Sequence, residues 1–229
     1  LAFGQTYKSH ELKSGKLVIH LSEGDLNLAP LTNKSVRVQW EKAGKKEERD
    51  FVFINKLPTP KFKVTDQGNL LKLTTSDLIV SYNKMDNVLS YANADGKVFL
   101  TEIAGTKKLE ANTVQNEDCF IAEQSFDSPN DEFLFGLGQF QDGHYNLRNI
   151  SRKLIQVNSQ IAIPFLYSSR GFGILWNQYG ITHFNPADNA VNLVKKEMAA
   201  GENNMVEGTT TSGTQKVSQR QSLYTGSFS

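Results

Sequence analysis

The chain has 229 residues, and its 25 Lys and Arg almost balance its 24 Asp and Glu, which leaves a formal net charge of +1. A nucleic-acid partner requires a basic excess that neutralises phosphates, so this balance argues against one. The sequence contains no apolar run of about 18 residues, so we expect no membrane span. The length suffices for one β-sandwich with a sizeable core.

Alternation of apolar and polar residues with a period of two dominates the chain. Turn chemistry recurs every ~8–12 residues, which is typical of a sandwich or a barrel. Asp95-Gly96 lies between two such runs and is a strong β-hairpin signal. We therefore predict an all-β, antiparallel β-sandwich with strands at residues 16–21, 36–40, 62–64, 71–73, 78–82, 88–91, 98–100, 120–127, 133–137, 154–169 and 172–177.

Helical periodicity is nearly absent, and the best candidate, residues 190–200, is short. Strands that alternate with helices, as a parallel α/β fold requires, are missing. A (β/α)8 barrel would need about 250 residues and eight such alternations, so it is excluded as well. We expect few or no helices.

The last part of the chain differs in composition. Residues 201–222 are rich in Gly, Thr, Ser, Asn and Gln, which is typical of a linker or a long loop. Residues 222–228 then have the pattern of a new strand for which no partner follows. We therefore expect a sandwich domain at residues 1–206, and a linker with the start of a following domain at residues 207–229, in a protein that continues beyond this point.

Cysteine and histidine residues form no recognisable site. The single cysteine, Cys119, cannot form an internal disulfide, and its neighbours Phe120 and Ile121 predict a buried strand position. The histidines are scattered without the spacing of a metal site, so we predict no metal and no cofactor. They are His10, His20, His144 and His183.

Residues 133–177 carry the most chemical information. Gly136 and Gly138 bracket Leu137 at the end of an apolar strand, which predicts a bend or a close approach of two backbones. The loop that follows combines amides, a histidine, an arginine and aromatic rings, a mixture that binds sugars through hydrogen bonds and ring stacking. An ordinary surface loop whose amides satisfy one another is the alternative. The loop residues are Gln139, Phe140, Gln141, His144, Tyr145, Asn146, Arg148 and Asn149.

A hairpin is expected where residues 163–167 and 172–177 flank Ser-Ser-Arg-Gly. We expect its apolar residues to lie mostly in the core. Trp176 is interpreted as a packed core side chain and not as a sugar-stacking platform.

Four short motifs in this stretch resemble the N-terminal domain of glycoside hydrolase family 31, which contains α-glucosidases, α-xylosidases and α-transglucosylases. The resemblance covers roughly residues 60–180 and is strongest to bacterial α-xylosidase-like members. Residues 215–228 are also similar to the lead-in of a PA14-type domain that such members insert before the barrel. The motifs are Phe135-Gly-Leu-Gly-Gln139, Asn158-Ser-Gln160, Ile163-Pro-Phe165 and Arg170-Gly-Phe-Gly-Ile-Leu-Trp-Asn177.

The resemblance implies a galactose-mutarotase-like β-sandwich (supersandwich) that packs on a catalytic (β/α)8 barrel and lends a loop to the rim of the active site. In the family, two aspartates on the barrel act as nucleophile and acid/base of a retaining hydrolysis, with carboxyl groups about 5–5.5 Å apart. The barrel is not in this chain, so we assign no catalytic residue and expect the chain alone to be inactive. The likeness to polysaccharide-degrading enzymes also implies a periplasmic or extracellular protein.

The candidate substrate-binding residues are Asn158, Gln160, Gln139 and His144. The resemblance implies the first two, since many members have Asn-x-Asp there and the Asp binds substrate hydroxyls beyond the cleaved bond. Gln160 replaces that acid, and an uncharged amide makes a weaker hydrogen bond, so we expect an altered sugar preference. Gln139 and His144 belong to the polar loop. The expected partners are an oligo- or polysaccharide and the barrel domain.

Two other functions are compatible with this sequence. A carbohydrate-binding module or surface glycan-binding protein, with no hydrolase attached, could use the same loop. A free-standing sugar epimerase would need an acid and a base that face one sugar. His144 is the only histidine in the loop, and no paired His and Glu is visible.

Overall fold

Strands make up all the regular secondary structure in the part of the chain that the computed structural model describes, which is residues 5–42, 52, 57–114, 116–178, 180–185, 193–194, 209–210 and 220–228. Neighbouring strands pair antiparallel in every sheet of this part. The prediction of an all-β antiparallel fold is confirmed. These residues include no helix that is long and apolar enough to span a membrane.

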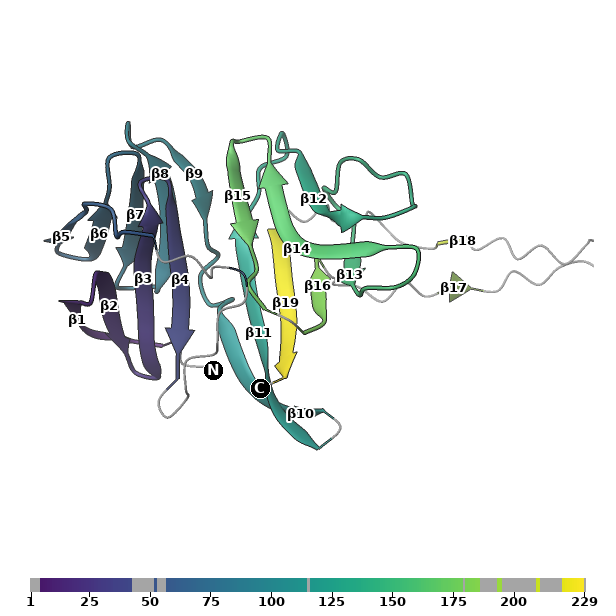
Figure 1. Cartoon of the computed structure of the whole chain (residues 1–229), viewed down its shortest axis with the longest axis horizontal. Helices are drawn as coiled ribbons and strands as arrows, with labels where there is room; N and C mark the ends of the chain where they lie inside the picture. Colours follow the sequence, from purple (N-terminus) through teal and green to yellow (C-terminus); the bar gives the residue numbers. More distant parts are fainter. Residues whose placement is uncertain are drawn as a thin grey trace, which may run out of the picture.

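The first nine strands form a sandwich of two meanders, in which each strand of a sheet pairs with the next one along the chain (Figure 1). Alternate side chains point between the two sheets. Leu17 and Leu28 of one sheet and Leu71 and Val80 of the other are completely buried there. The four-stranded sheet consists of β1 (Tyr7–Lys13), β2 (Lys16–Leu21), β3 (Gly24–Thr32) and β4 (Ser35–Glu41), and the five-stranded sheet of β5 (Lys63–Gln67), β6 (Leu70–Thr74), β7 (Leu78–Asn83), β8 (Val88–Asn93) and β9 (Val98–Thr101).

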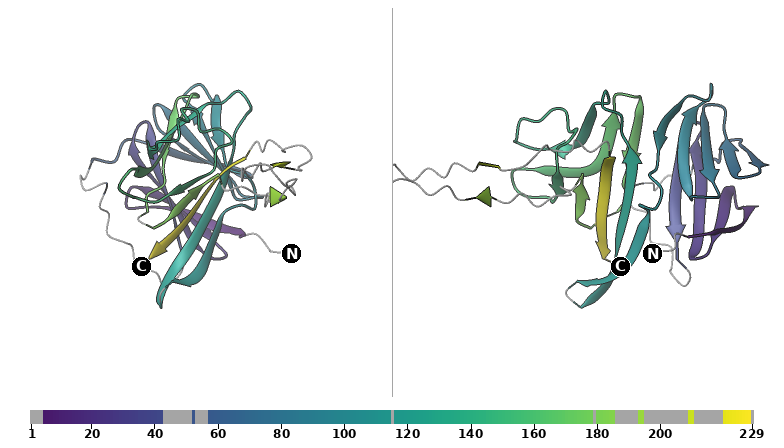
Figure 2. Two further views of the ribbon diagram at one scale, coloured as in Figure 1. Left: turned by 90° about the vertical axis from the view of Figure 1, so that its right-hand side faces the viewer. Right: turned by 180° about the vertical axis from the view of Figure 1, so that it is seen from behind.

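A second sandwich lies beside the first (Figures 1 and 2). Phe126 and Phe184 of its five-stranded sheet pack against Leu134, Leu137 and Leu166 of its three-stranded side. In spatial order, the five-stranded sheet contains β10 (Lys108–Val114), β11 (Glu117–Asp127), β19 (Arg220–Phe228), β16 (Thr182–Phe184) and β13 (Arg152–Leu154), the three-stranded sheet contains β12 (Leu134–Gln139), β14 (Ile161–Ser168) and β15 (Phe172–Leu175), and a short ribbon pairs β17 (Leu193–Val194) with β18 (Thr209–Thr210).

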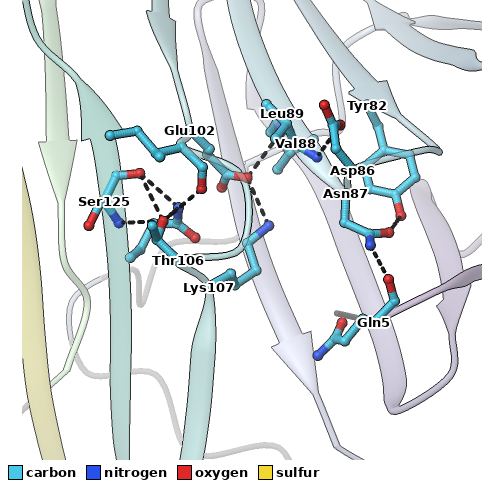
Figure 3. A network of polar contacts seen from close by, with 12 residues as sticks. Gln5, Tyr82, Asp86, Asn87, Val88, Leu89, Glu102, Thr106, Lys107 and Ser125 are labelled. Atoms are coloured by element: carbon cyan, nitrogen blue, oxygen red, sulfur yellow. Dashed lines mark hydrogen bonds and ion pairs between the residues drawn. The ribbon is translucent and has the colours of Figure 1, made fainter. Parts of the chain in front are cut away.

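A polar network at Glu102 joins the two sandwiches (Figure 3). Its Oε2 accepts hydrogen bonds from the backbone N–H of Leu89 on β8 at 3.0 Å and from Lys107 Nζ at 2.9 Å. The backbone of Glu102 also forms an isolated bridge to Phe126 on β11. A buried carboxylate is stable only when it is hydrogen-bonded or paired. Glu102 is 6% exposed, so its carboxylate depends on these hydrogen bonds. Since Glu102 contacts β8 of the first sandwich and β11 of the second, we infer that it helps to hold the two sandwiches together as one unit.

The strand near the end of the chain departs from expectation. β19 is present, but it pairs with β11 along its whole length and with β16 on its other side. The expectation that this strand lacks a partner is therefore wrong, and its pairing places it in the second sandwich instead of a following domain. Its partners lie far away along the chain, where a local pattern cannot reveal them. The boundary predicted between residues 206 and 207 lies outside the described residues.

Other differences concern the lengths of elements. The run at 154–169 is broken, because β13 ends at Leu154, a turn follows, and β14 begins at Ile161 in the other sheet. β1 and β10 were missed because they are edge strands whose residues are mostly exposed, so they lack an apolar alternation. β3 and β16 were not predicted either, although both are inner strands with buried residues. The helix candidate 190–200 falls largely outside the described residues, and the described pair Leu193–Val194 is a strand.

Candidate functional site

Two loops at one end of the three-stranded sheet contain three of the four predicted site residues, and the fourth, Gln139, directly precedes the first loop. The loop at 140–151 leads from β12 to β13, and the loop at 155–160 leads from β13 back to β14. Gln139, the last residue of β12, pairs with Ile161, the first residue of β14. Both loops therefore meet at the same end of the sheet, on the right-hand side of Figure 1. We call these two loops, together with Gln139, the rim.

The glycine pair before the rim brings two backbones together. Gly136, Leu137 and Gly138 all have positive φ, at +105°, +62° and +102°. A Cβ on Gly136 would lie 2.5 Å from the Phe165 carbonyl oxygen, and one on Gly138 would lie 1.9 Å from the Ile161 oxygen. The register with β14 shifts between the two glycines. The predicted close approach is confirmed, and Leu137 turns into the core, where it is 1% exposed.

The turn at residues 157–160 presents the Asn-x-Gln motif. Val157 and Gln160 form a bridge, with the Gln160 N–H donating to the Val157 oxygen at 3.2 Å. The Gln156 side chain spans the base of the turn, because its Nε2 donates to the Gln160 carbonyl at 3.0 Å and its Oε1 accepts from the Ala162 N–H at 3.1 Å. Sequence reasoning missed Gln156, since nothing local marks an amide as a turn clamp.

The pairing of β12 with β14 brings two of the four predicted residues, Gln139 and Gln160, near each other. Gln139 lies opposite Ile161, the neighbour of Gln160, whereas Asn158 lies at the turn and His144 on the other loop. Gln139, His144 and Asn158 are exposed and Gln160 is partly exposed. Within the described residues none of these four side chains makes a hydrogen bond. Their donors and acceptors are therefore available to a ligand.

Other polar residues of the first loop have structural roles. Asn146 Oδ1 accepts hydrogen bonds from the N–H groups of Leu134 and Arg148, both at 3.1 Å. The Arg148 guanidinium donates to Ser128 Oγ at 2.8 Å and to its carbonyl oxygen at 3.0 Å. These contacts anchor the loop base to the start of β12. The hypothesis that the whole polar loop contacts sugar is thus too broad for Asn146 and Arg148.

A buried arginine holds the tip of the same loop. Arg152 Nη2 lies 2.8 Å from both carboxylate oxygens of Asp142, and the guanidinium lies 4.0 Å from the centre of the Phe140 ring. Asp142 Oδ1 also accepts the N–H of His144 at 3.2 Å. Burial opposes ionisation of Asp142, but the His144 N–H and the Arg152 guanidinium outweigh it and hold the pKa of this carboxyl below its usual value.

An exposed apolar surface adjoins the rim. On β14, Leu166 and Ser168 point into the core, whereas every second side chain points outward and is between 43% and 49% exposed. The expectation that this hairpin is mostly core is therefore wrong for its outer face, although Trp176 does pack against the core as predicted. A contiguous exposed apolar surface is typical of regions that contact another molecule or domain. We define the apolar face as Phe133, Ile161, Ile163, Phe165 and Tyr167.

An aromatic cluster extends this face toward the first loop. The Tyr145 ring, 85% exposed, lies 5.3 Å from the Phe135 ring, and Phe135 lies 6.4 Å from Tyr167. Aromatic pairs at these distances attract one another. Among the described residues, no group of three or more His, Cys, Asp or Glu side chains is arranged to hold a metal ion.

The model of the glycosyl hydrolase 31 N-terminal galactose mutarotase-like domain matches residues 25–185, well over half of the chain. The chain belongs to this family. The match extends further toward the N-terminus than the resemblance over residues 60–180 indicated, and it includes β3 and β4 of the first sandwich.

Relatives in the family are named as glycosidases. The chain is 33% identical over 116 residues to an uncharacterised family 31 glucosidase of Pseudescherichia vulneris, an alignment that covers 51% of the chain and 20% of the relative. It is 38% identical over 71 residues to an α-xylosidase of Saccharolobus solfataricus, covering 27% and 10%. The crystal structure of a family 31 α-xylosidase from Xanthomonas citri superposes with a TM-score of 0.70 at 28% identity, over 82% of the chain and 20% of that protein. The chain thus spans a small part of these proteins.

Proposed function

We propose that this chain is the accessory N-terminal domain of a retaining α-glycosidase. In this proposal the apolar face packs on a catalytic (β/α)8 barrel, and the rim contributes to the substrate-binding site. The whole protein hydrolyses α-glucosidic or α-xylosidic bonds in oligo- or polysaccharides. The two catalytic carboxylates belong to the barrel, so the chain binds and orients substrate but performs no covalent step.

One juxtaposition carries the proposal: an exposed apolar face continues directly into a polar rim. Ile161 begins β14 within the apolar face, and its strand partner Gln139 and its neighbour Gln160 belong to the rim. If the apolar face packs on the barrel, the adjoining rim lies at the edge of that contact. Unsatisfied amides at such an edge can bind sugar hydroxyls.

The central test is activity in the presence and absence of the remainder of the protein. The full-length enzyme is expected to hydrolyse α-xylosides or α-glucosides with retention of anomeric configuration, whereas residues 1–229 alone are expected to show no turnover. Turnover that co-purifies with the 229-residue chain would refute the assignment as an accessory domain. A periplasmic or extracellular location is also part of the proposal, and fractionation of the source cells tests it.

Replacing Gln160 with alanine in the full-length enzyme is expected to change substrate preference more than stability. Loss of a neutral hydrogen bond costs about 1 kcal/mol, so kcat/KM for a disaccharide should fall about fivefold relative to an aryl glycoside that lacks the leaving sugar. The unfolding free energy should change by less than about 0.5 kcal/mol, because the side chain makes no hydrogen bond within the described residues.

The matched control is Gln67→Ala, which removes an exposed glutamine from β5 of the first sandwich. This control is expected to leave both substrates unaffected. If Gln160→Ala instead abolishes expression of folded protein, Gln160 is a structural residue and its role in substrate binding is refuted.

A further inference from the structure

Arg152 occupies an unusual environment for a charged side chain. It lies on β13, an edge strand, yet its side chain is only 4% exposed. Nη2 binds Asp142, but no acceptor within the described residues lies within hydrogen-bonding distance of Nε or Nη1. Burying a guanidinium with part of its donors unpaired costs free energy. Stabilisation of the fold alone therefore does not explain a buried arginine at this position.

The contacts of Arg152 converge on one loop. Phe140, Asp142 and His144 follow one another at every second position after β12. Phe140 stacks on the guanidinium and Asp142 forms the ion pair with it. The Asp142 carboxylate in turn accepts a hydrogen bond from the backbone N–H of His144. A planar guanidinium can lie flat on a ring while its N–H groups point in its own plane at a carboxylate, and a tetrahedral ammonium does not reproduce this geometry. One side chain thus determines the path of the chain between Gln139 and His144.

We propose that Arg152 is a positioning residue for substrate binding: it holds the loop of residues 140–144 in the conformation that presents Gln139 and His144 at the rim. This inference rests on the proposed function of the rim. Arg152 itself does not touch substrate, because its side chain is buried beneath the loop. Its effect reaches the substrate through Phe140 and Asp142.

The test compares three variants of the full-length enzyme. Arg152→Met keeps most of the volume but removes the charge, Arg152→Lys keeps the charge but not the planar fork, and Asp142→Asn removes the ion pair from the exposed side of the loop. The control is Arg170→Met, which breaks the ion pair of Arg170 with Asp131 (3.3 Å) beyond the opposite end of β14.

Two measurements are made on each protein. Amide hydrogen exchange reports the order of residues 139–145, and steady-state kinetics compare a disaccharide with an aryl glycoside that has no leaving sugar. Arg152→Met and Asp142→Asn are expected to exchange about tenfold faster in this loop, and to lose about tenfold in kcat/KM for the disaccharide, mainly through KM. Arg152→Lys should restore little of either. Arg170→Met should match the wild type.

The outcomes separate the two proposals. If the wild-type enzyme is active but Arg152→Met and Asp142→Asn leave loop exchange and the disaccharide KM unchanged, the positioning role is overturned. It is also overturned if both substrates lose activity equally while the melting temperature falls, because that pattern indicates a structural role alone. If the wild-type enzyme hydrolyses no α-glycoside, the proposed function fails, while the exchange measurement still decides whether Arg152 orders the loop.

Discussion

Gly138→Ala is expected to destabilise the protein by about 4 kcal/mol or more, and it is the most damaging single-methyl change near the rim. The added Cβ would lie 1.9 Å from the Ile161 carbonyl oxygen, and φ at this position is +102°, which L side chains rarely adopt. Relief requires β12 and β14 to separate where Gly138 pairs with Ala162. Urea unfolding followed by circular dichroism measures the loss.

Gly143→Ala provides the matched control. Gly143 also has a positive φ, at +74°, but a Cβ there would meet no atom within 4 Å. Only conformational strain remains, which costs about 1–2 kcal/mol. The difference in unfolding free energy between Gly138→Ala and Gly143→Ala therefore measures the cost of the close backbone approach, separately from the cost of the positive φ. Equal losses for the two variants would contradict this interpretation.

These glycines illustrate what the sequence could predict. Two glycines around one leucine at the end of an apolar strand indicated a close backbone approach, because only glycine leaves room for it. In the same way Asp95-Gly96 predicted the turn between β8 and β9, where Gly96 has a φ of +82°. Both predictions succeeded because the glycines that reveal the close approach and the turn in the sequence are the same residues that form them. The family motifs extended this local information to the identity of the domain.

Several of the features that were missed depend on contacts that a local sequence pattern does not encode. β19 finds its partners in β11 and β16, and the period-two pattern of a strand does not encode its neighbour. Arg152 was missed for the same reason: its role depends on Asp142, which lies across a loop, and on burial that the edge position of β13 does not suggest. Alternation also did not reveal that the outer face of β14 is exposed, because apolar residues point to both sides of that strand.

Ile163→Glu in the full-length protein is expected to disrupt docking of this domain on the remainder of the enzyme. Ile163 is 48% exposed in the chain and is one of the outward-facing residues of the apolar face. If that face is buried against a barrel, the substitution removes about 1 kcal/mol of apolar burial and places an unpaired carboxylate in the contact, at a cost of several kcal/mol. A loss of about 3 kcal/mol would weaken docking about 100-fold. Calorimetry should then show two unfolding transitions instead of one.

Leu12→Glu distinguishes docking from a general effect of surface charge. Leu12 is 60% exposed on β1, an edge strand of the first sandwich that contributes nothing to the apolar face. A glutamate there should change the unfolding free energy by less than about 0.5 kcal/mol and leave a single transition. The two variants add the same charge at similarly exposed apolar positions. A difference in their unfolding transitions therefore indicates that another part of the protein covers Ile163 but not Leu12. If Ile163→Glu behaves like Leu12→Glu, the apolar face is open in the full-length protein, and the rim has to reach a substrate by another arrangement of the domains.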